Sequence, residues 1–567
     1  MDASFWEGKR APGIEDAIDL GKYRHLAELI NTSVSRFADR PAYTCMNQTL
    51  TYAEINELSN GFAAYLQKHT SLQPGDRIAI QLPNIIQYPI VVYGAMKAGL
   101  VVVNTNPLYT AREMLHQFND SGVKLLVCLN TVAHIVEEIL PRTGLEQVVV
   151  TEMGDSLPWM KRLLVNFTVR HVKKMVPQYS LPEAVAFNDA MMKGMVADYC
   201  PVSGSQQDDL AVLQYTGGTT GVAKGVMLTQ KNIIANVLQT SALRHQVDQD
   251  GRLISDLRGD IVVAPLPLYH VYAFTVHLFS FFELGAHSIL IPNPRDIDSL
   301  ISALQPWQIN TFIGLNTLFA RLLSHPEFHR LDFSGLTVTN SGGTALQEPV
   351  ARQWHEVTGC RISEGYGLTE AAPIVAANPA GELTQLGTVG PALSSTSIKI
   401  VTDDGEEVNP GEAGELCVKG PQIMKGYWNR PEATAEVLDT EGWLHTGDIA
   451  VIQEDGYIRI VDRIKDLVIV SGFNVYPNEI ENVVALHEKV DQCAVIGVPD
   501  EKAGEAVKLF VVRSDQSLTE QAIRDWCGQQ LTSYKMPKYI EFRQELPMSA
   551  VGKVLRKQLR TEEASIG

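Results

Sequence analysis

Apolar and polar positions follow two rhythms in the first part of the chain. Residues 76–82 and 123–128 are short apolar runs typical of buried strands. Between them, residues 110–120 carry apolar side chains at helical spacing. Strands that alternate with helices favour parallel sheets, so we expect an α/β fold here.

The pattern changes near residue 388. Residues 397–401 and 414–419 are β-rich runs, and turn residues rich in Gly, Pro, Asp and Glu separate them. Turns this close together predict a small antiparallel sheet or barrel. We place this β-barrel subdomain at about residues 388–461.

The last hundred residues predict a separate α+β unit. The expected helices are 477–486 and 519–531, and the expected strands are 490–497 and 508–512. The charged run 462–466 precedes this unit and lies between two apolar strands. We expect the joint between two domains there.

Length and charge narrow the class of protein. A chain of 567 residues is too long for one compact core. The formal net charge of -18 argues against nucleic-acid binding.

The seven cysteines share no short spacing, so the sequence contains no local motif of a zinc knuckle or a redox pair. This pattern favours a protein of the reducing cytoplasm. The polar N-terminus lacks the apolar core of a signal peptide, and the apolar stretch 90–103 is too short to span a bilayer.

Residues 159–176 combine apolar side chains with lysines and arginines. A basic amphipathic helix of this kind can lie on an anionic membrane surface. The other interpretation is a surface helix that covers the edge of a core. The first interpretation predicts a protein at the inner face of the cytoplasmic membrane.

The strongest chemical signal is the segment 215–225 (YTGGTTGVAKG), which follows an apolar strand at 210–213. Its glycines let the backbone approach a ligand closely. Its hydroxyls, exposed N–H groups and Lys224 suit phosphate oxygens. The pattern is not a Walker A loop.

Three further segments carry candidate chemistry. In 364–370 (EGYGLTE), glycines would let Tyr366 lie against a planar ligand, and Glu370 offers a hard oxygen ligand for Mg²⁺. The others are 442–448 (GWLHTGD) and 547–556 (PMSAVGKVLR). Each of these three segments alone is weak evidence for a function.

In this order and spacing, the four segments resemble the adenylate-forming superfamily of acyl-CoA synthetases, nonribosomal-peptide adenylation domains and beetle luciferases. The resemblance runs from residue 50 to residue 553. Residues 442–466 and 470–481 are similar to the signature of fatty-acyl-CoA synthetases. The resemblance to the superfamily implies an α/β fold. The large N-terminal domain (1–461) would contain two helix-flanked, mainly parallel sheets plus the β-barrel. A hinge (462–467) would join it to a small mobile α+β domain (468–567).

The resemblance also implies roles for matching residues. Thr216 and Glu370 would hold Mg²⁺, Asp448 would bind the ribose hydroxyls with support from Arg463, and Lys553 would bridge the substrate carboxylate and the α-phosphate. The catalytic residues implied are Lys553, Glu370, Thr216 and His270. Those implied for ATP and AMP are Thr216, Gly217, Gly218, Thr219, Thr220, Gly221, Lys224, Gly343, Thr344, Gly365, Tyr366, Gly367, Thr369, Asp448 and Arg463. Two positions depart from the family: Ala223 replaces a common Pro, and Met548 replaces a frequent basic residue.

Residues 265–274 resemble the family's acyl-tunnel region, with His270 near the carboxylate and Phe274 at the position of an aromatic gate. The apolar run 278–282 would line a tunnel or form a buried core helix. Ser471, Gly472 and Phe473 would approach coenzyme A after rotation about a hinge at Asp462 and Lys465.

The resemblance thus predicts an enzyme that uses ATP, Mg²⁺ and coenzyme A to convert medium- or long-chain fatty acids into acyl-CoA through an acyl-adenylate. It is also compatible with a homodimer. Alternatives within enzymes are a synthetase for aromatic or short acids and a ligase that feeds a carrier protein. An alternative of another class is a lipid-binding or uptake protein without catalysis.

Overall fold

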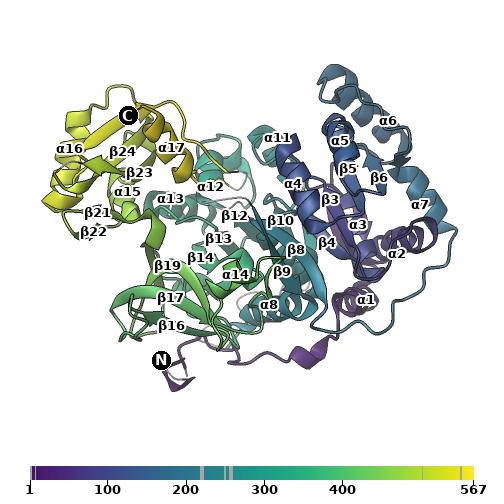
Figure 1. Cartoon of the computed structure of the whole chain (residues 1–567), viewed down its shortest axis with the longest axis horizontal. Helices are drawn as coiled ribbons and strands as arrows, with labels where there is room; N and C mark the ends of the chain where they lie inside the picture. The colour runs from purple at the N-terminus through teal and green to yellow at the C-terminus, as the bar shows by residue number, and fades with distance from the viewer. Residues whose placement is uncertain are drawn as a thin grey trace.

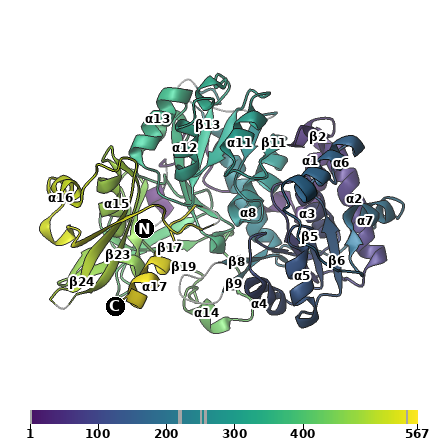
Figure 2. The same ribbon diagram turned by 90° about the horizontal axis from the view of Figure 1, so that it is seen from above.

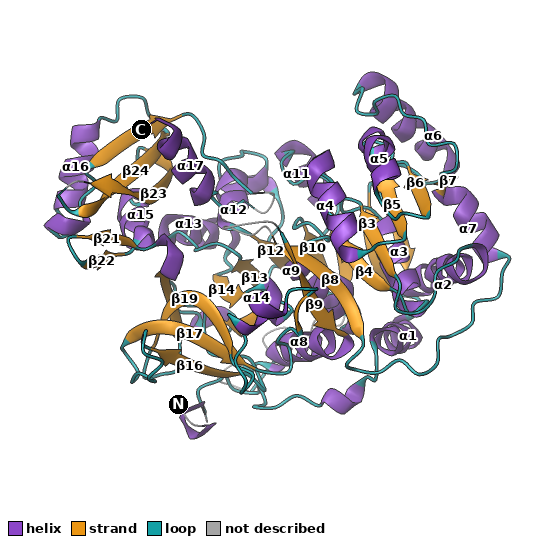
Figure 3. Cartoon of the chain, in the orientation of Figure 1, coloured by secondary structure: helices purple, strands orange, loops and turns teal. Residues whose placement is uncertain are grey.

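Two eight-stranded sheets carry most of the chain. The computed structural model describes residues 3–6, 8–216, 223–247, 251–253, 259–500, 502–549 and 552–566. The first sheet is parallel from β14 to β1 and has an antiparallel strand at each edge (Figure 3). Its strands are, across the sheet, β15 (Ile374–Ala377), β14 (Ile362–Gly367), β13 (Val338–Gly342), β12 (Thr311–Gly314), β10 (Ile261–Ala264), β11 (His287–Leu290), β1 (Pro41–Cys45) and β2 (Gln48–Thr51).

The second sheet is parallel from β8 to β7, and β9 and β18 extend it in antiparallel fashion. Its strands are, across the sheet, β18 (Gly426–Tyr427), β9 (Lys224–Thr229), β8 (Leu210–Thr216), β4 (Val101–Asn104), β3 (Arg77–Gln81), β5 (Leu125–Leu129), β6 (Gln147–Thr151) and β7 (Val185–Ala186). The predicted α/β class and the strands expected near 76–82, 123–128 and 210–213 are confirmed.

Helices cover both sheets, and the largest core cluster joins the sheets through some of them. Ile78 of β3 and Val262 of β10 belong to this one buried cluster. In Figure 2, α8 lies between the two sheets. The helices are α1 (Leu26–Phe37), α2 (Tyr52–His69), α3 (Gln87–Lys97), α4 (Ala111–Ser121), α5 (Ala133–Ile139), α6 (Trp159–Phe167), α7 (Phe187–Met195), α8 (Gln230–Ala242), α9 (Val271–Thr275), α10 (Phe281–Glu283), α11 (Ile297–Leu304), α12 (Asn316–Leu323), α13 (Glu348–Thr358) and α14 (Pro431–Ala435).

Local sequence sets several helix ends. Thr51 and Thr110 cap α2 and α4, and in each case the glutamate three residues later completes a capping box. Helix α4 ends at Ser121 and is capped by Gly122, whose φ of 61° is the left-handed conformation that glycine adopts without strain. The helix predicted over 110–120 is therefore confirmed.

The next unit is an antiparallel sheet in the order β16 (Ser397–Val401), β17 (Ala413–Lys419), β19 (Leu444–Ile452) and β20 (Ile458–Arg463). The antiparallel character predicted here is confirmed. In the described residues the strand pairing ends at β16 and β20, so of the predicted sheet or barrel this unit has the form of a four-stranded sheet.

A short 3₁₀ helix, η10 (Ile464–Asp466), follows β20 and leads to the C-terminal unit. That unit lies at one end of the molecule (Figure 1). It contains β21 (Val468–Val470), β22 (Phe473–Val475), α15 (Pro477–Ala485), β23 (Val490–Asp500), β24 (Gly504–Arg513), α16 (Glu520–Gly528), β25 (Tyr539–Arg543) and α17 (Arg556–Ile566). The α+β character predicted from the last hundred residues is confirmed.

Within the described ranges, no helix is both long and apolar enough to cross a bilayer. All seven cysteines are free thiols.

Candidate active site

Strands β8 and β9 form a hairpin that carries the glycine-rich segment. Thr216, the last residue of β8, pairs with Lys224, the first residue of β9. The predicted phosphate-binding residues between them, Gly217, Gly218, Thr219, Thr220 and Gly221, lie outside the described residues. The two described ends of the segment are thus held side by side by sheet hydrogen bonds.

Tyr427 connects this hairpin to Glu370. Strand β18 pairs with β9, which places the Tyr427 ring 4.9 Å below the Lys224 ammonium. The Tyr427 hydroxyl donates a hydrogen bond to Glu370 Oε1 (2.7 Å), and burial beside this carboxylate raises the Tyr427 pKa. Tyr427 carries no signal of this role in the sequence, because only the long-range pairing of β18 with β9 brings it here.

Glu370 and Thr216 supply the oxygen donors expected of a Mg²⁺ site. Glu370 lies in the 3₁₀ helix η8 (Thr369–Ala371), which packs beside β9. Tyr427 uses one lone pair of one carboxylate oxygen, so the carboxylate keeps acceptor capacity for a cation. A carboxylate and a hydroxyl are hard oxygen donors of the kind that Mg²⁺ prefers, and these residues fit that ion.

Asp448 gathers residues from three strands. Its Oδ2 accepts a hydrogen bond from the Tyr366 hydroxyl on β14 (2.5 Å), and its Oδ1 lies 2.9 Å from Arg463 Nε on β20. Asp448 itself is on β19, opposite Arg463, and is only 4% exposed. A buried charge is stable when it is paired and hydrogen-bonded, as here. Three predicted site residues thus meet at one carboxylate.

The turn after β13 forms a second wall. Gly343 has a φ of 84°, and a Cβ there would lie 3.8 Å from the Cε of Lys553. The Thr344 hydroxyl is buried without a hydrogen-bond partner among the described residues. Strand β13 pairs Gly342 with Gly365 of β14, so these small residues line up next to Tyr366.

Glu364 holds this wall and was not predicted to have a role. Its two carboxylate oxygens accept hydrogen bonds from the backbone N–H groups of Leu346 (3.1 Å) and Gly387 (3.2 Å). Burial raises the Glu364 pKa to about 7. The residue sits at the start of the EGYGLTE segment, but nothing local in the sequence indicates its partners.

Lys553 reaches the site from the C-terminal unit. Gly552, with φ of 69°, packs so closely that a Cβ would lie 2.8 Å from the Thr317 hydroxyl of α12. Burial lowers the Lys553 pKa to about 8, with Arg463 acting in the same direction and Asp448 opposing it. The lysine therefore lies within the field of the Asp448 cluster, although it is far from it in the sequence.

His270 lies near Lys553 at the start of α9. Its Nδ1 accepts a hydrogen bond from the Tyr272 N–H (3.3 Å), so a neutral ring carries its proton on Nε2. Burial, with Lys553 as a second cause, lowers the His270 pKa to about 4. The imidazole is thus neutral at pH 7 and able to donate a hydrogen bond.

The apolar region predicted after His270 is buried. Phe274 is fully buried and its ring centroid lies 5.4 Å from that of Phe279. The chain continues from α9 into a π-helical turn, η6 (Val276–Ser280), a form found often at functional sites. The buried aromatic side chains of this region include Tyr43, Tyr52, Tyr93, Phe274, Phe279, Phe281 and Phe282.

The residues predicted for coenzyme A lie within the C-terminal unit. Ser471 and Gly472 form the turn between β21 and β22, and the Phe473 ring stacks on Tyr534 with centroids 4.9 Å apart. Phe473 is 56% exposed. The described contacts of Ser471, Gly472 and Phe473 do not include Lys553. This fits the arrangement for the first half-reaction, in which Lys553 is in the active site and the coenzyme A residues are not.

The predicted hinge residues flank the end of β20. Asp462 is buried and accepts a hydrogen bond from the Asn478 N–H at the start of α15 (2.8 Å), and burial raises its pKa to about 6. Lys465 lies in η10, where desolvation by the surrounding protein lowers its pKa. Asp466 pairs with Arg556 (3.5 Å) and Arg560 (2.8 Å) of α17.

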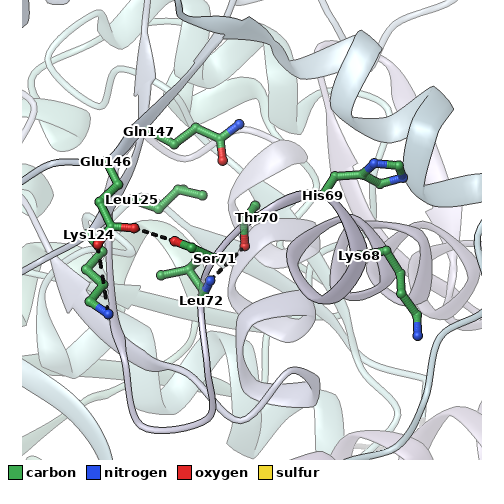
Figure 4. A pocket seen from close by; sticks show the side chains of 9 residues that line it. All are labelled: Lys68, His69, Thr70, Ser71, Leu72, Lys124, Leu125, Glu146 and Gln147. Atoms are coloured by element: carbon green, nitrogen blue, oxygen red, sulfur yellow. Dashed lines mark hydrogen bonds and ion pairs between the residues drawn. The ribbon is translucent and has the colours of Figure 1, made fainter.

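A polar groove of about 450 Å³ lies elsewhere (Figure 4). It includes Leu125 and Gln147, the first residues of β5 and β6, whereas Thr216 ends β8. Ligands of open α/β sheets bind at the carboxyl ends of the strands, so this groove is at the wrong edge. Its lining residues are Lys68, His69, Thr70, Ser71, Leu72, Lys124, Leu125, Glu146 and Gln147.

A site that joins a glycine-rich hairpin, a buried carboxylate and a lysine from a second unit defines a class of nucleotide-using ligases. Family comparison agrees: residues 30–428 match the AMP-binding enzyme family and residues 479–553 match the AMP-binding enzyme C-terminal domain. The chain belongs to the AMP-binding enzyme family.

Relatives in this family include proteins of similar length. The chain is 47% identical to a long-chain-fatty-acid–CoA ligase of Escherichia coli O157:H7, over 98% of both chains. It is 31% identical to 4-coumarate–CoA ligase 2 of Oryza sativa subsp. japonica, over 97% of this chain and 94% of the relative. Among solved structures, ATP-bound MatB from Rhodopseudomonas palustris matches with a TM-score of 0.80 and 28% identity, over 95% of this chain and 99% of MatB.

Proposed function

We propose that this chain is a long-chain-fatty-acid–CoA ligase that forms AMP and pyrophosphate. The observation that carries the proposal is the position of Lys553 beside Gly343, within the field of the Asp448 cluster. The full-length similarity to ligases of this name supports the substrate class. ATP, Mg²⁺ and coenzyme A are the partners that this chemistry requires.

In the first half-reaction, a carboxylate oxygen of the fatty acid attacks the α-phosphorus of ATP. The bond to pyrophosphate breaks, and acyl-adenylate forms. Two anions must approach each other, and the Lys553 ammonium offsets their repulsion. Mg²⁺ held by Glu370 and Thr216 would add positive charge against the phosphate oxygens.

Fixed groups orient the two substrates. Asp448, held by Tyr366 and Arg463, accepts hydrogen bonds from the ribose hydroxyls through its remaining lone pairs. Gly343, Thr344 and the backbone around Gly365 and Gly367 frame the adenine. The His270 Nε2–H donates a hydrogen bond to the carboxylate of the fatty acid, and the apolar region around Phe274 binds the alkyl chain.

In the second half-reaction, the coenzyme A thiol attacks the acyl carbonyl carbon, AMP leaves, and the thiol proton passes to solvent. Lys553 has to withdraw for this step, and Ser471, Gly472 and Phe473 approach in its place. The ion pairs of Asp466 with Arg556 and Arg560 would carry Asp466 along with α17, so the bend falls before Asp466.

A panel of acids tests this function. Purified protein with ATP, Mg²⁺ and coenzyme A should form thioesters with kcat/KM rising up to roughly fourfold per methylene until the tunnel is filled, because each buried methylene contributes about 0.8 kcal/mol. Thioester formation is measured with acids from acetate to stearate and with cinnamate. A preference for cinnamate or acetate would favour an aromatic or short-acid synthetase. Absence of pyrophosphate release with every acid would favour a non-catalytic lipid-binding protein.

The half-reactions should separate in Lys553→Ala. We expect acyl-adenylate formation to fall by roughly a hundredfold or more, because an electrostatic group of the transition state is removed. Thioester formation from supplied acyl-adenylate should stay near the wild-type rate. Equal losses in both half-reactions would contradict the role given to Lys553.

We also infer a peripheral contact with anionic membranes through α6 and the π-helical turn that follows it, η4 (Thr168–Val172). Neither segment has a buried residue, which disfavours the alternative of a helix that covers a core edge. Trp159 is 71% exposed, and α6 lies at the end of the molecule opposite the C-terminal unit (Figures 1 and 2). The exposed apolar side chains are Trp159, Met160, Leu163, Leu164, Phe167, Val172 and Met175.

Charge and substrate chemistry favour a lipid surface as the occupant. Arg162 and Arg170 are paired with Asp155 and Glu152. Lys173 and Lys174 are exposed next to this apolar face, and such cations attract anionic headgroups. Long-chain acids partition into bilayers, so the contact would deliver substrate. The homodimer compatible with the family resemblance stays a prediction.

Leu163→Glu combined with Phe167→Glu should lower binding to phosphatidylglycerol vesicles by about tenfold or more, because each buried side chain of this size contributes about 1.5–3 kcal/mol. Co-sedimentation measures the bound fraction. Val196→Glu is the matched control, since Val196 is 87% exposed but lies outside α6. Unchanged binding in the double variant, or after neutralising Lys173 and Lys174, would remove this contact from the account.

A further inference from the structure

Glu415, Cys417 and His445 form a compact cluster on the antiparallel sheet, outside the groups used above. Cys417 of β17 is directly paired with His445 of β19. Glu415 lies two residues before Cys417 on the same strand, and alternate residues of a strand share a face. Within the described residues, this is the only group of three or more Cys, His, Asp and Glu side chains whose ligand atoms gather this closely.

The donor atoms lie close to the spacing that a metal ion requires. His445 Nδ1 lies 2.8 Å from Glu415 Oε2 and 3.4 Å from Cys417 Sγ, and all three atoms lie within 4.8 Å of one another. Ligands of a tetrahedral zinc ion, at bond lengths of about 2.0–2.3 Å, are separated by roughly 3.3–3.8 Å. Small side-chain adjustments would therefore seat an ion between them.

The chemistry of the donors selects the ion. Thiolate and imidazole ligands suit zinc and similar transition ions, whereas Mg²⁺ and Ca²⁺ prefer oxygen alone. The side chains of His445 and Glu415 are 34% and 21% exposed, and Cys417 is fully buried. An ion can thus enter from solvent, take three protein ligands and keep a water in the fourth position.

We propose that Glu415, Cys417 and His445 form a binding site for a zinc-class divalent cation. The ion binds the Cys417 thiolate, whose proton passes to solvent, and the neutral His445 ring, whose proton then lies on Nε2. It replaces the hydrogen bond between His445 and Glu415 with two metal bonds and links β17 to β19 through side chains.

The site is coupled to the nucleotide pocket through the same carboxylate. Glu415 Oε1 accepts a hydrogen bond from the Gly447 N–H (3.0 Å), and Gly447 immediately precedes Asp448. An ion seated between Glu415 and His445 spreads these side chains from their 2.8 Å contact toward the ligand spacing of zinc. Because Glu415 also holds the Gly447 N–H, this movement shifts Gly447 and with it the Asp448 carboxylate. The cation therefore weakens ATP binding; this consequence rests on the proposed function.

Cobalt spectroscopy tests the site without an assay of activity. Co²⁺ added to the purified full-length protein should give a near-ultraviolet thiolate-to-cobalt band, which Zn²⁺ removes. Cys417→Ser should abolish the band and weaken Co²⁺ binding by roughly tenfold or more. His445→Asn should weaken it similarly, which covers the case in which one variant fails to fold. Cys200→Ser is the control, because Cys200 is an exposed free thiol elsewhere. No band in the wild type, or a band that persists in Cys417→Ser, overturns the site.

The coupling has its own readout. Zn²⁺ should raise the apparent KM for ATP in the wild type and in Cys200→Ser but not in Cys417→Ser, and a zinc-selective chelator should reverse the effect. Zinc binding with an unchanged KM contradicts the coupling while the spectrum upholds the site. Absence of ligase activity in every variant without zinc counts instead against the proposed function.

Discussion

The Asp448 carboxylate is the charge around which the site is organised. It is buried, and it is stable there because Tyr366 and Arg463 supply a hydrogen bond and an ion pair. Tyr366 comes from the first large sheet and Arg463 from the strand that ends at the joint, so one carboxylate ties together the elements around the joint. The same charge favours the ammonium of Lys553 against the effects of burial and of Arg463.

This arrangement explains why the catalytic lysine sits on a separate unit. A cation that assists the approach of a carboxylate to a polyphosphate would obstruct a thiol that attacks the product. A lysine fixed in the large unit would remain in place during both steps. Lys553 can instead enter and leave the site together with the C-terminal unit. The neighbouring Gly552 lacks a side chain, which permits the close contact with Thr317. The partly buried Asp462–Asn478 hydrogen bond lies where that movement must occur.

Local patterns in the sequence predict the elements well and their long-range contacts poorly. The capping residues Thr51 and Thr110, the strand before Thr216 and the segments around Tyr366 and Asp448 carry signals within a few residues, and family resemblance joins them into one site. Tyr427 and Glu364 carry no such signal, because the first depends on β18 pairing with β9 and the second on backbone N–H groups from two distant turns. The Cys417–His445 pair is hidden for the same reason: its members are adjacent only across strands. Turn spacing near residue 388 predicts antiparallel pairing, which the structure confirms, but it does not determine whether the edge strands meet, so it cannot distinguish a sheet from a barrel.

The account depends most on Lys553 acting as a charged group in adenylation. Single-turnover acyl-adenylate formation without coenzyme A should be measured against pH in the wild type and in Lys553→Arg, at substrate concentrations well below saturation. The second-order rate constant obtained in this way corresponds to kcat/KM, which reports the ionisation of the free enzyme. With the Lys553 pKa lowered to about 8, the ammonium is lost as pH rises through that value, and the wild-type kcat/KM should fall there. Lys553→Arg should be slower, since the two side chains differ in shape, but should show no fall in this range because its guanidinium stays charged. A fall near pH 8 of equal size in both proteins would contradict the central role of this lysine.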